Sequence, residues 1–178
     1  RLGNPPKVGK RVLVLGGGDV AFDAARTALR LGASDVHLAF LESHEAMQAS
    51  PGEVRAATEE GINLHPSRSF VRIVDRDGRV NGVECVNVVS FNFSPKGGLE
   101  LETEPGSEHV LECDTVVFAI GQGVELGSLA IEGGVDVTST GAAVADPETM
   151  QTQRRGVFAA GDAVTGTSFV VEAIAAGH

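Results

Sequence analysis

The chain has 178 residues, of which 42% are hydrophobic, 21% are charged and 23 in number are glycine, an ordinary composition for a folded α/β protein. Acidic side chains number 24 against 14 Lys and Arg, and the net charge of −10 argues against nucleic acid as a partner because phosphate binding demands a basic surface. No apolar run approaches the roughly 18 residues of a membrane-spanning helix, so we expect no membrane partner either.

The first predicted elements are a strand over residues 11–15 and a helix from about Asp19 to Leu31. The strand is a short run of Val and Leu, which is typical of a strand buried on both faces. Apolar residues recur at spacings of three and four along the helix, so it presents a single buried face. This face comprises Val20, Ala21, Ala24, Ala28 and Leu31. Gly32 stands where a glycine closes a helix.

A strand over residues 35–41, a second helix and a third strand beginning at Ile62 come next. Ser50 is the candidate N-cap of the second helix, Pro51 is its first residue, and Glu53 completes a capping box. A glycine ends this helix. The order strand–helix–strand–helix–strand predicts right-handed crossovers and a parallel sheet.

The pattern changes after Ser67 to extended runs separated by turns. A hairpin is predicted around residues 75–78, which read Asp-Arg-Asp-Gly, and a second pair of extended runs flanks residues 104–107. We expect an antiparallel meander packed against the parallel sheet, with the chain returning to a core strand at 115–120. An exposed loop tip is predicted at 94–98.

The last third of the chain has a different character. From Gly121 it is glycine-rich, with short strands and a final apolar helix that starts at about Ser168. The sequence stops inside this helix, at His178, and it begins with a linker-like stretch that has no initiator Met. We therefore expect the chain to be an excised piece of a larger enzyme.

The glycine turn after the first strand is the main candidate for a binding site. Gly16, Gly18 and Ala21 match the dinucleotide-binding fingerprint in its Gly-x-Gly-x-x-Ala form, between a strand and a helix as that motif requires. Gly16 would make the tight bend, Gly18 would leave room for the pyrophosphate, and Ala21 would let the helix pack closely on the strand. Gly17 and Val20 belong to the same turn and are also candidate cofactor contacts. The phosphates would lie at the helix N-terminus, where the dipole favours negative charge. The alternative is a glycine turn with a purely structural role.

Two acidic residues near this turn are further candidates. Asp19 is either the N-cap of the helix, the favoured interpretation, or a carboxylate that fixes the loop or the nicotinamide side by hydrogen bonds. Glu42, 24 residues after Gly18, stands near the position where an acid binds both ribose hydroxyls of NAD and repels a 2′-phosphate. Residues 40–44 contain no Arg or Lys, so NAD is favoured over NADP. The alternative for Glu42 is a solvent-facing strand end.

The cysteines and histidines show no catalytic pattern. Cys85 and Cys113 form neither a Cys-x-x-Cys pair nor a metal cluster, so we expect buried structural thiols and a reducing, cytoplasmic compartment. His37, His65 and His109 have no partner pattern, and structural or solvated roles are expected for each. The sequence therefore predicts no catalytic side chain and no metal site.

Four stretches of the chain resemble a known family. They read GGGDVAFDAARTALRLGA, EVRAATEEGINL, TVVFAIGQ and GVFAAGDAVTGTSFVVEAIAAGH, and they span nearly the whole chain in this order. They resemble the small subunit of glutamate synthase and its relatives, which are FAD-dependent pyridine nucleotide-disulphide oxidoreductases with two dinucleotide folds. The flavin half of dihydropyrimidine dehydrogenase is similar as well.

The resemblance implies a nucleotide-binding domain inserted into a FAD-binding domain. Residues 1–121 would then form a Rossmann-like, three-layer α/β domain that binds NAD(P), with a parallel sheet and an antiparallel β-meander. Gly121, at the end of this domain, is counted among the cofactor contacts. Residues 122–178 would be the returning C-terminal part of the FAD-binding domain, which is incomplete in this chain.

Within this second part the resemblance implies flavin contacts. Gly161 and Asp162 match the motif whose aspartate binds the ribityl and phosphate region of FAD, with an ordinary turn aspartate as the alternative. Thr167 matches a contact on the isoalloxazine side. The first FAD fingerprint and the iron–sulfur region of many relatives are absent from these residues. The missing N-terminal FAD half and an iron–sulfur domain or subunit are therefore the expected partners.

The resemblance also bears on the nucleotide and on the activity. Relatives that use NADPH carry a Tyr-Arg-Arg-Ser-like stretch where this chain has Phe40-Leu41-Glu42-Ser43, which again favours NAD. The expected parent is an enzyme that passes hydride between NAD(P)H and FAD for onward transfer to an iron–sulfur partner, while this chain alone is expected to be inactive. The alternative is a non-catalytic nucleotide-sensing or assembly module with the same fold. Self-association is expected, because the second part would expose apolar surface.

Overall fold

The structure is a computed structural model, and it describes residues 6–94, 98–127 and 132–178. Most of the loop tip predicted at 94–98 lies outside these residues. Within the described ranges we find no helix whose length and apolar character would let it cross a membrane.

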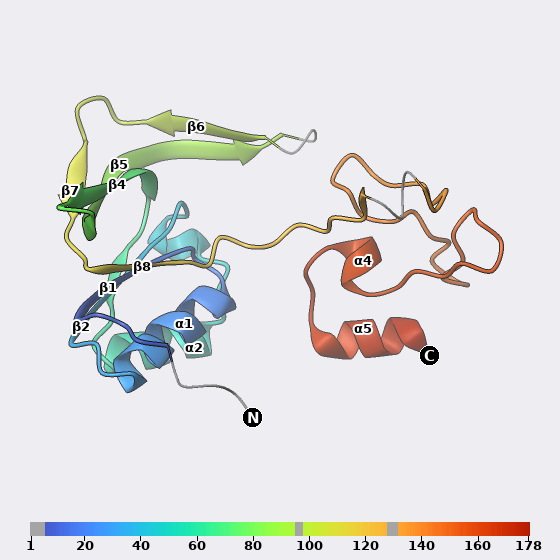
Figure 1. Ribbon diagram of the computed structural model, residues 1–178, viewed down its shortest axis with the longest axis horizontal. Helices are drawn as coiled ribbons and strands as arrows, with labels where there is room; N and C mark the ends of the chain where they lie inside the picture. Colours follow the sequence, from blue (N-terminus) through green and yellow to red (C-terminus); the bar gives the residue numbers. More distant parts are fainter. Residues whose placement is uncertain (1–5, 95–97, 128–131) are drawn as a thin grey trace. The chain divides into compact units, whose positions relative to one another are not determined.

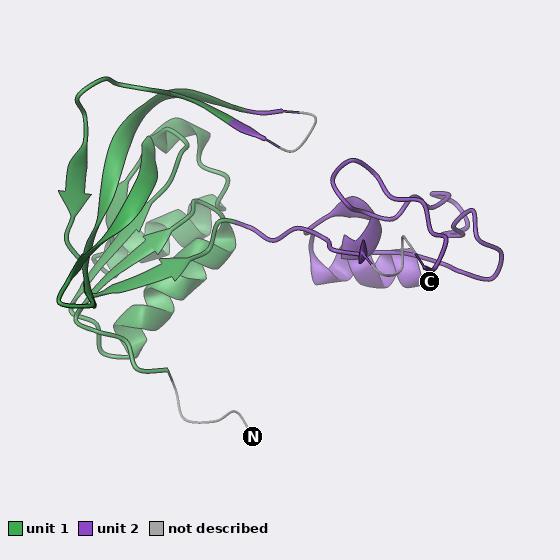
Figure 2. Cartoon of the chain, turned by 45° about the horizontal axis from the view of Figure 1, so that its top comes forward, with its two compact units in different colours: residues 1–92, 100–120 green, residues 93–99, 121–178 purple. Residues whose placement is uncertain are grey.

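The chain divides into two units, which Figure 2 shows in different colours. The first unit comprises residues 1–92 and 100–120, and the second comprises residues 93–99 and 121–178. The main break follows Ile120, one residue before the expected domain boundary. The assignment of the two parts to NAD(P)-binding and FAD-binding domains stays a prediction.

Four parallel strands form the central sheet of the first unit. β1 (Arg11–Leu15) pairs with β2 (Asp35–Ala39) and with β8 (Thr115–Phe118), and β3 (Asn63–His65) pairs with β2. The strand order is β3-β2-β1-β8, and Figure 1 labels β2, β1 and β8 of this sheet. This is the half-sheet order of a dinucleotide-binding fold, in which β1 lies beside the point where the order reverses. The predicted α/β class with a parallel sheet is confirmed.

Two helices cover one face of this sheet (Figure 1). They are α1 (Asp19–Arg30) and α2 (Pro51–Glu59), and a short 3₁₀ helix, η1 (His44–Ala46), precedes α2. Glycines follow both helices with φ of +98° and +84°, which confirms the predicted glycine closures.

The buried face of α1 differs from the predicted one. It consists of Ala21, Phe22, Ala25 and Ala28. Phe22 is fully buried against the strands, whereas Val20 is 70% exposed. Phe22 determines which face of α1 is buried, because burying its large aromatic side chain stabilises the fold more than burying Val20 and Ala24 would. The prediction for Val20 as a core position was therefore wrong, because Val20 is exposed, whereas Ala24 is partly buried and packs against the core.

An antiparallel sheet follows in the chain and forms a third layer. It contains β4 (Arg68–Arg76), β5 (Arg79–Phe93), β6 (Leu99–Thr103) and β7 (His109–Leu111). The predicted hairpin joins β4 and β5 through an Asp-Gly pair with φ of 54° and 72°. β6 and β7 both pair with β5, so the predicted turn at 104–107 joins two short strands that use successive parts of one long strand.

A second cluster of buried side chains joins the two sheets. Leu13, Leu15 and Ala39 from the parallel sheet pack with Val83, Cys85 and Cys113. Both thiols are free and fully buried, as predicted, and burial raises the pKa of each to about 11. They are therefore unreactive side chains of the core at neutral pH.

The second unit has little regular structure. It contains α4 (Asp162–Thr165) and α5 (Val170–Gly177), and isolated β-bridges join short extended segments between residues 137 and 158. α5 begins two residues after the predicted start. Among the described residues of this unit, the apolar side chains that are buried are Ala142 and Ala143.

Candidate functional site

The glycine turn lies at the carboxyl end of β1, where the strand meets α1. Gly16 has a φ of 135°, and a Cβ added there would lie 2.2 Å from the backbone oxygen of Ala119, at the end of β8. The turn therefore passes too close to the neighbouring strand for any side chain. The structural role expected of Gly16 in a tight bend fits this geometry.

Gly18 lacks a side chain for a different reason. It is the N-cap of α1, with an ordinary extended φ of −90°, and an added Cβ would meet no atom within 4 Å. Neither backbone conformation nor protein packing explains a glycine at this position. The open space lies at the N-terminus of an α-helix, which is where the pyrophosphate of a bound dinucleotide is expected.

Gly17 is required by its neighbours in the protein. A Cβ added at Gly17 would lie 2.9 Å from Cβ of Phe40 and 2.9 Å from Oε2 of Glu42. The middle glycine thus lets the end of β2 approach the turn. Its predicted role as a cofactor contact stays a prediction, as does that of Val20 in the first turn of α1.

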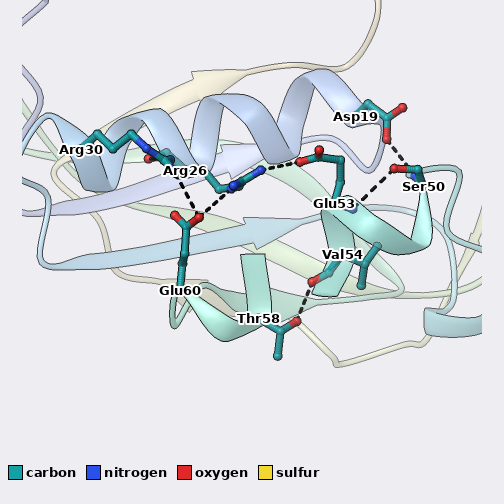
Figure 3. A network of polar contacts seen from close by, with 8 residues as sticks. All are labelled: Asp19, Arg26, Arg30, Ser50, Glu53, Val54, Thr58 and Glu60. Atoms are coloured by element: carbon teal, nitrogen blue, oxygen red, sulfur yellow. Dashed lines mark hydrogen bonds and ion pairs between the residues drawn. The ribbon is translucent and has the colours of Figure 1, made fainter. Parts of the chain in front are cut away.

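Asp19 does not cap α1, so the favoured interpretation of this residue was wrong. Gly18 is the N-cap, and Asp19 is the first residue of the helix. Its Oδ1 accepts a hydrogen bond of 2.8 Å from the backbone N–H of Ser50, the N-cap of α2 (Figure 3). The carboxylate therefore fixes the segment that precedes α2, and its alternative role at the loop or the nicotinamide side stays a prediction.

The predicted capping box of α2 is half formed. Ser50 Oγ accepts from the backbone N–H of Glu53 at 3.4 Å, but the Ser50 N–H donates to Asp19 instead of to Glu53. The Glu53 carboxylate accepts from Arg26 on α1 at 2.7 Å (Figure 3). A tertiary contact has replaced the local one because α1 lies alongside α2.

An ion-pair network joins the two helices further along. Arg26 donates to Glu60 at 2.9 Å, and Arg30 donates to the same carboxylate at 3.0 Å (Figure 3). The hydrogen bond from Arg26 is the main cause of the lowered pKa of Glu60. Together with the Asp19–Ser50 bond, this network holds α2 alongside α1.

Glu42 lies three residues beyond the end of β2, at the same edge of the sheet as the glycine turn. Its backbone oxygen accepts from the N–H of Ser67 at 2.8 Å, and its Oε1 accepts from Nε2 of Gln48 at 3.0 Å. The side chain is partly buried, so it is more than a solvent-facing strand end. Its predicted role as a ribose acceptor stays a prediction.

The opposite side of the turn, along β8, is apolar. Phe118 and Ile120 are exposed there, and Phe118 contacts Phe70 of β4 edge-on, with ring centroids 5.8 Å apart. Gly121 follows with a φ of 92°. In a sheet of this order the adenosine is expected on the β2 side and the nicotinamide on the β8 side. The polar Glu42 after β2 and the apolar Phe118 and Ile120 along β8 fit that orientation.

Two histidines that the sequence left unpaired contact each other. Nδ1 of His37 on β2 lies 2.8 Å from Nε2 of His65 on β3, and Nε2 of His37 lies 3.0 Å from the Asp35 carboxylate. Burial is the main cause of the lowered pKa of His65, and the nearby His37 adds to it. The described part of the chain contains no group of three or more His, Cys, Asp and Glu side chains arranged to hold a metal ion.

The predicted flavin contacts lie together in the second unit. Gly161 has a φ of 60°, and Asp162 begins α4, where its Oδ1 accepts from the backbone N–H of Ser168 at 3.3 Å. Thr167 donates its hydroxyl to the backbone oxygen of Gln122 at 3.1 Å. Asp162 and Thr167 are exposed, so both remain accessible to a ligand. Their flavin roles stay predictions.

Comparison with known proteins identifies the relatives of the chain. The family model described as pyridine nucleotide-disulphide oxidoreductase matches residues 1–177. The NADP(+)-dependent formate dehydrogenase subunit beta of Moorella thermoacetica is 41% identical over 98% of the chain. The NADPH-Fe(3+) oxidoreductase subunit beta of Geobacter sulfurreducens is 35% identical over 99% of the chain, and the glutamate synthase [NADPH] small chain of Escherichia coli is 38% identical over 96%.

The chain is much shorter than these relatives. It spans 24%, 30% and 37% of their respective lengths. Among solved structures, thioredoxin reductase of T. acidophilum matches 96% of the chain and is itself covered over 50% of its length, with a TM-score of 0.76 and 22% sequence identity. This likeness supports the fold described above.

Proposed function

The chain belongs to the pyridine nucleotide-disulphide oxidoreductase family, and from this premise we propose that its first unit binds a nicotinamide dinucleotide within a larger flavin-dependent oxidoreductase. The observation that carries the proposal is the open space at Gly18. A strand, a tight turn and a helix N-terminus surround this glycine, and an added Cβ would meet no atom from elsewhere in the protein within 4 Å. A pyrophosphate needs such a space and such a helix terminus.

In the proposed complex the chain's own residues bind and orient the dinucleotide. The N-terminal turn of α1 would hold the pyrophosphate, Glu42 would accept the ribose hydroxyls, and the apolar edge beside Phe118 would receive the nicotinamide. Among the described residues no side-chain arrangement suggests an acid–base or nucleophilic catalyst, and hydride transfer between two bound rings requires none. Positioning is therefore the main contribution of this unit.

FAD is the proposed second cofactor of the longer protein. Asp162 and Thr167 would contact it, and when bound it supplies the two-electron acceptor for the hydride of the reduced nicotinamide. The local geometry fits in one respect, since a Cβ at Gly161 would lie 2.9 Å from Cβ of Ala173, so this loop approaches α5 closely. We propose that another part of the longer protein completes this site and that electrons leave to an iron–sulfur partner, because the relatives are named as subunits and are longer than this chain.

NAD is the proposed nucleotide. Glu42 carries a negative charge at the ribose end of the site, and no Arg or Lys lies between Phe40 and His44 to bind a 2′-phosphate. The relatives reported above carry NADP(+) or NADPH in their names, so the proposal is that this chain departs from them in its choice of nucleotide.

Calorimetric titration of the chain with NADH and with NADPH, at one fixed salt concentration, tests the proposal. We expect NADH to bind more tightly than NADPH. We expect Glu42→Ala to raise the Kd for NADH about tenfold, the loss typical of a hydrogen bond to a charged group. Tighter binding of NADPH would contradict the NAD assignment alone. Binding of neither nucleotide would contradict the proposed function and favour an assembly module without nucleotide binding.

A further inference from the structure

The side chain of Gln48 has one clear interaction in the structure, and this interaction is with the candidate specificity residue. Gln48 Nε2 donates to Oε1 of Glu42 at 3.0 Å. Oε2 of Glu42 lies against Gly17, which leaves no space for a Cβ on that side. The carboxylate is thus held between an amide donor and the glycine turn. A glutamate side chain that is restrained in this way loses less rotamer freedom when a ligand binds.

The segment that carries Gln48 is itself anchored at its far end. Two residues after Gln48, the backbone N–H of Ser50 donates to the Asp19 carboxylate at 2.8 Å. At the near end, Glu42 accepts the N–H of Ser67 through its backbone oxygen. The stretch from Glu42 to Ser50, including η1, therefore spans two fixed points on either side of the glycine turn. The backbone at Gln48 is thereby kept where its side chain can reach Glu42.

The chemistry of the pair suits discrimination between two dinucleotides. An ionised carboxylate has about four acceptor positions, so one bond from Gln48 leaves enough for both ribose hydroxyls. An amide is neutral, so Glu42 retains its whole negative charge toward a 2′-phosphate. A Lys or Arg at the position of Gln48 would hold the carboxylate equally well but would cancel that charge.

We propose that Gln48 is a positioning residue, which holds the Glu42 carboxylate in the orientation that accepts the ribose of NAD and excludes the 2′-phosphate of NADP. This inference rests on the proposed function and deepens it. Nothing in the family fingerprint points to Gln48, because the residue lies outside the glycine turn and contacts it only through Glu42.

Isothermal titration of NADH and NADPH into the full 178-residue chain tests the proposal. Gln48→Met removes the donor but keeps the length of an exposed side chain, so the fold should be unaffected. We expect the Kd for NADH to rise about three- to tenfold, the range for one hydrogen bond to a charged group. The Kd for NADPH should change less than about twofold. The ratio of the two Kd values, which measures the preference for NADH, should therefore move toward one.

The matched control is Gln153→Met in the second unit, where the side chain donates to the backbone oxygen of Gly134. This variant should bind both dinucleotides as the unchanged chain does. An unchanged or lower Kd for NADH in Gln48→Met would overturn the proposal, because Gln48 would then be irrelevant to ribose binding or would compete with it. An equal loss of both dinucleotides would also overturn it, since a merely structural role predicts that result. If the unchanged chain binds neither dinucleotide, the proposed function fails instead. If Glu42→Ala leaves NADH binding intact, the ribose role of Glu42 is wrong and the proposal for Gln48 fails with it, while the proposed function stands.

Discussion

The two units of the chain differ in how much apolar surface they bury. The first unit has two clusters of buried side chains, one on each face of its parallel sheet, and Phe22, Leu13 and Leu38 are almost completely buried there. In the second unit α5 is the longest helix among the described residues, yet Val170 and Val171 are 75% and 71% exposed. Burial of apolar area is the dominant favourable term in folding. The first unit is therefore built to fold by itself, and the second is not.

The largest expected effect separates the units physically. We expect residues 1–120 to unfold cooperatively when they are expressed alone, with nearly the stability of the first unit in the whole chain. Residues 121–178 alone should show no cooperative transition, because fewer than about 60 residues without a buried core rarely fold. Far-UV circular dichroism during heating is the suitable measurement, since the chain has no Trp or Tyr to report by fluorescence. A cooperative transition of the second fragment would contradict this comparison.

One apolar-to-alanine substitution in each unit measures how much the buried apolar surface of that unit contributes to stability. Phe22→Ala should lower the free energy of unfolding by about 3–5 kcal/mol, because it empties a fully buried aromatic site between α1 and the sheet. Ile174→Ala on α5 should change it by less than about 0.5 kcal/mol, since this side chain is largely exposed. Urea unfolding followed by circular dichroism measures both variants. Similar losses would show that the second unit has a core that its burial does not reveal.

Within the first unit, two glycines of one turn should behave in opposite ways. Gly16→Ser places a side chain against the Ala119 backbone at a positive φ, and we expect a loss of about 3 kcal/mol of stability. Gly18→Ser adds a good N-cap residue in open space, so stability should stay within about 0.5 kcal/mol. The Kd for NADH should nevertheless rise by about tenfold or more, because the hydroxyl occupies the expected pyrophosphate position. Full binding by Gly18→Ser would show that the open space is not the phosphate site.

A smaller effect concerns pH and is confined to the first unit. The pKa of His65 is lowered in the folded chain, so the unfolded chain binds a proton more readily. Stability that His65 contributes is complete above about pH 6.5, the ordinary histidine pKa, and is lost as the pH falls below that value. His65→Phe should make the unfolding temperature of the first unit less sensitive to pH between about 7 and 5. An identical pH dependence in the variant would remove His65 as its cause.

Several features of the fold and the site followed from the sequence because local chemistry determines them. The run of Val and Leu predicted β1. The glycine closures predicted the ends of α1 and α2, and the Asp-Gly turn predicted the β4–β5 hairpin. Contacts between distant residues did not follow. Asp19 reaches Ser50, and Glu53 reaches Arg26, only because two helices pack side by side, and each contact displaced a local capping interaction.

Other details required strand pairing that one sequence does not reveal. His37 and His65 meet because β2 and β3 are adjacent and parallel, with Ala39 opposite His65 in register. Once that pairing is assumed, their proximity becomes predictable. Gln48 gave no signal at all, since an exposed amide in a loop is uninformative until its partner is known.

Hydrogen exchange with and without saturating NADH shows which unit of the chain binds the dinucleotide. We expect slower exchange on binding at residues 16–21 and 42–50, around the glycine turn and the Glu42–Ser50 segment. Residues 132–178 should exchange at the same rate with and without NADH. Slowing confined to the second unit, or no slowing anywhere despite saturation, would show that the first unit is not the dinucleotide-binding unit.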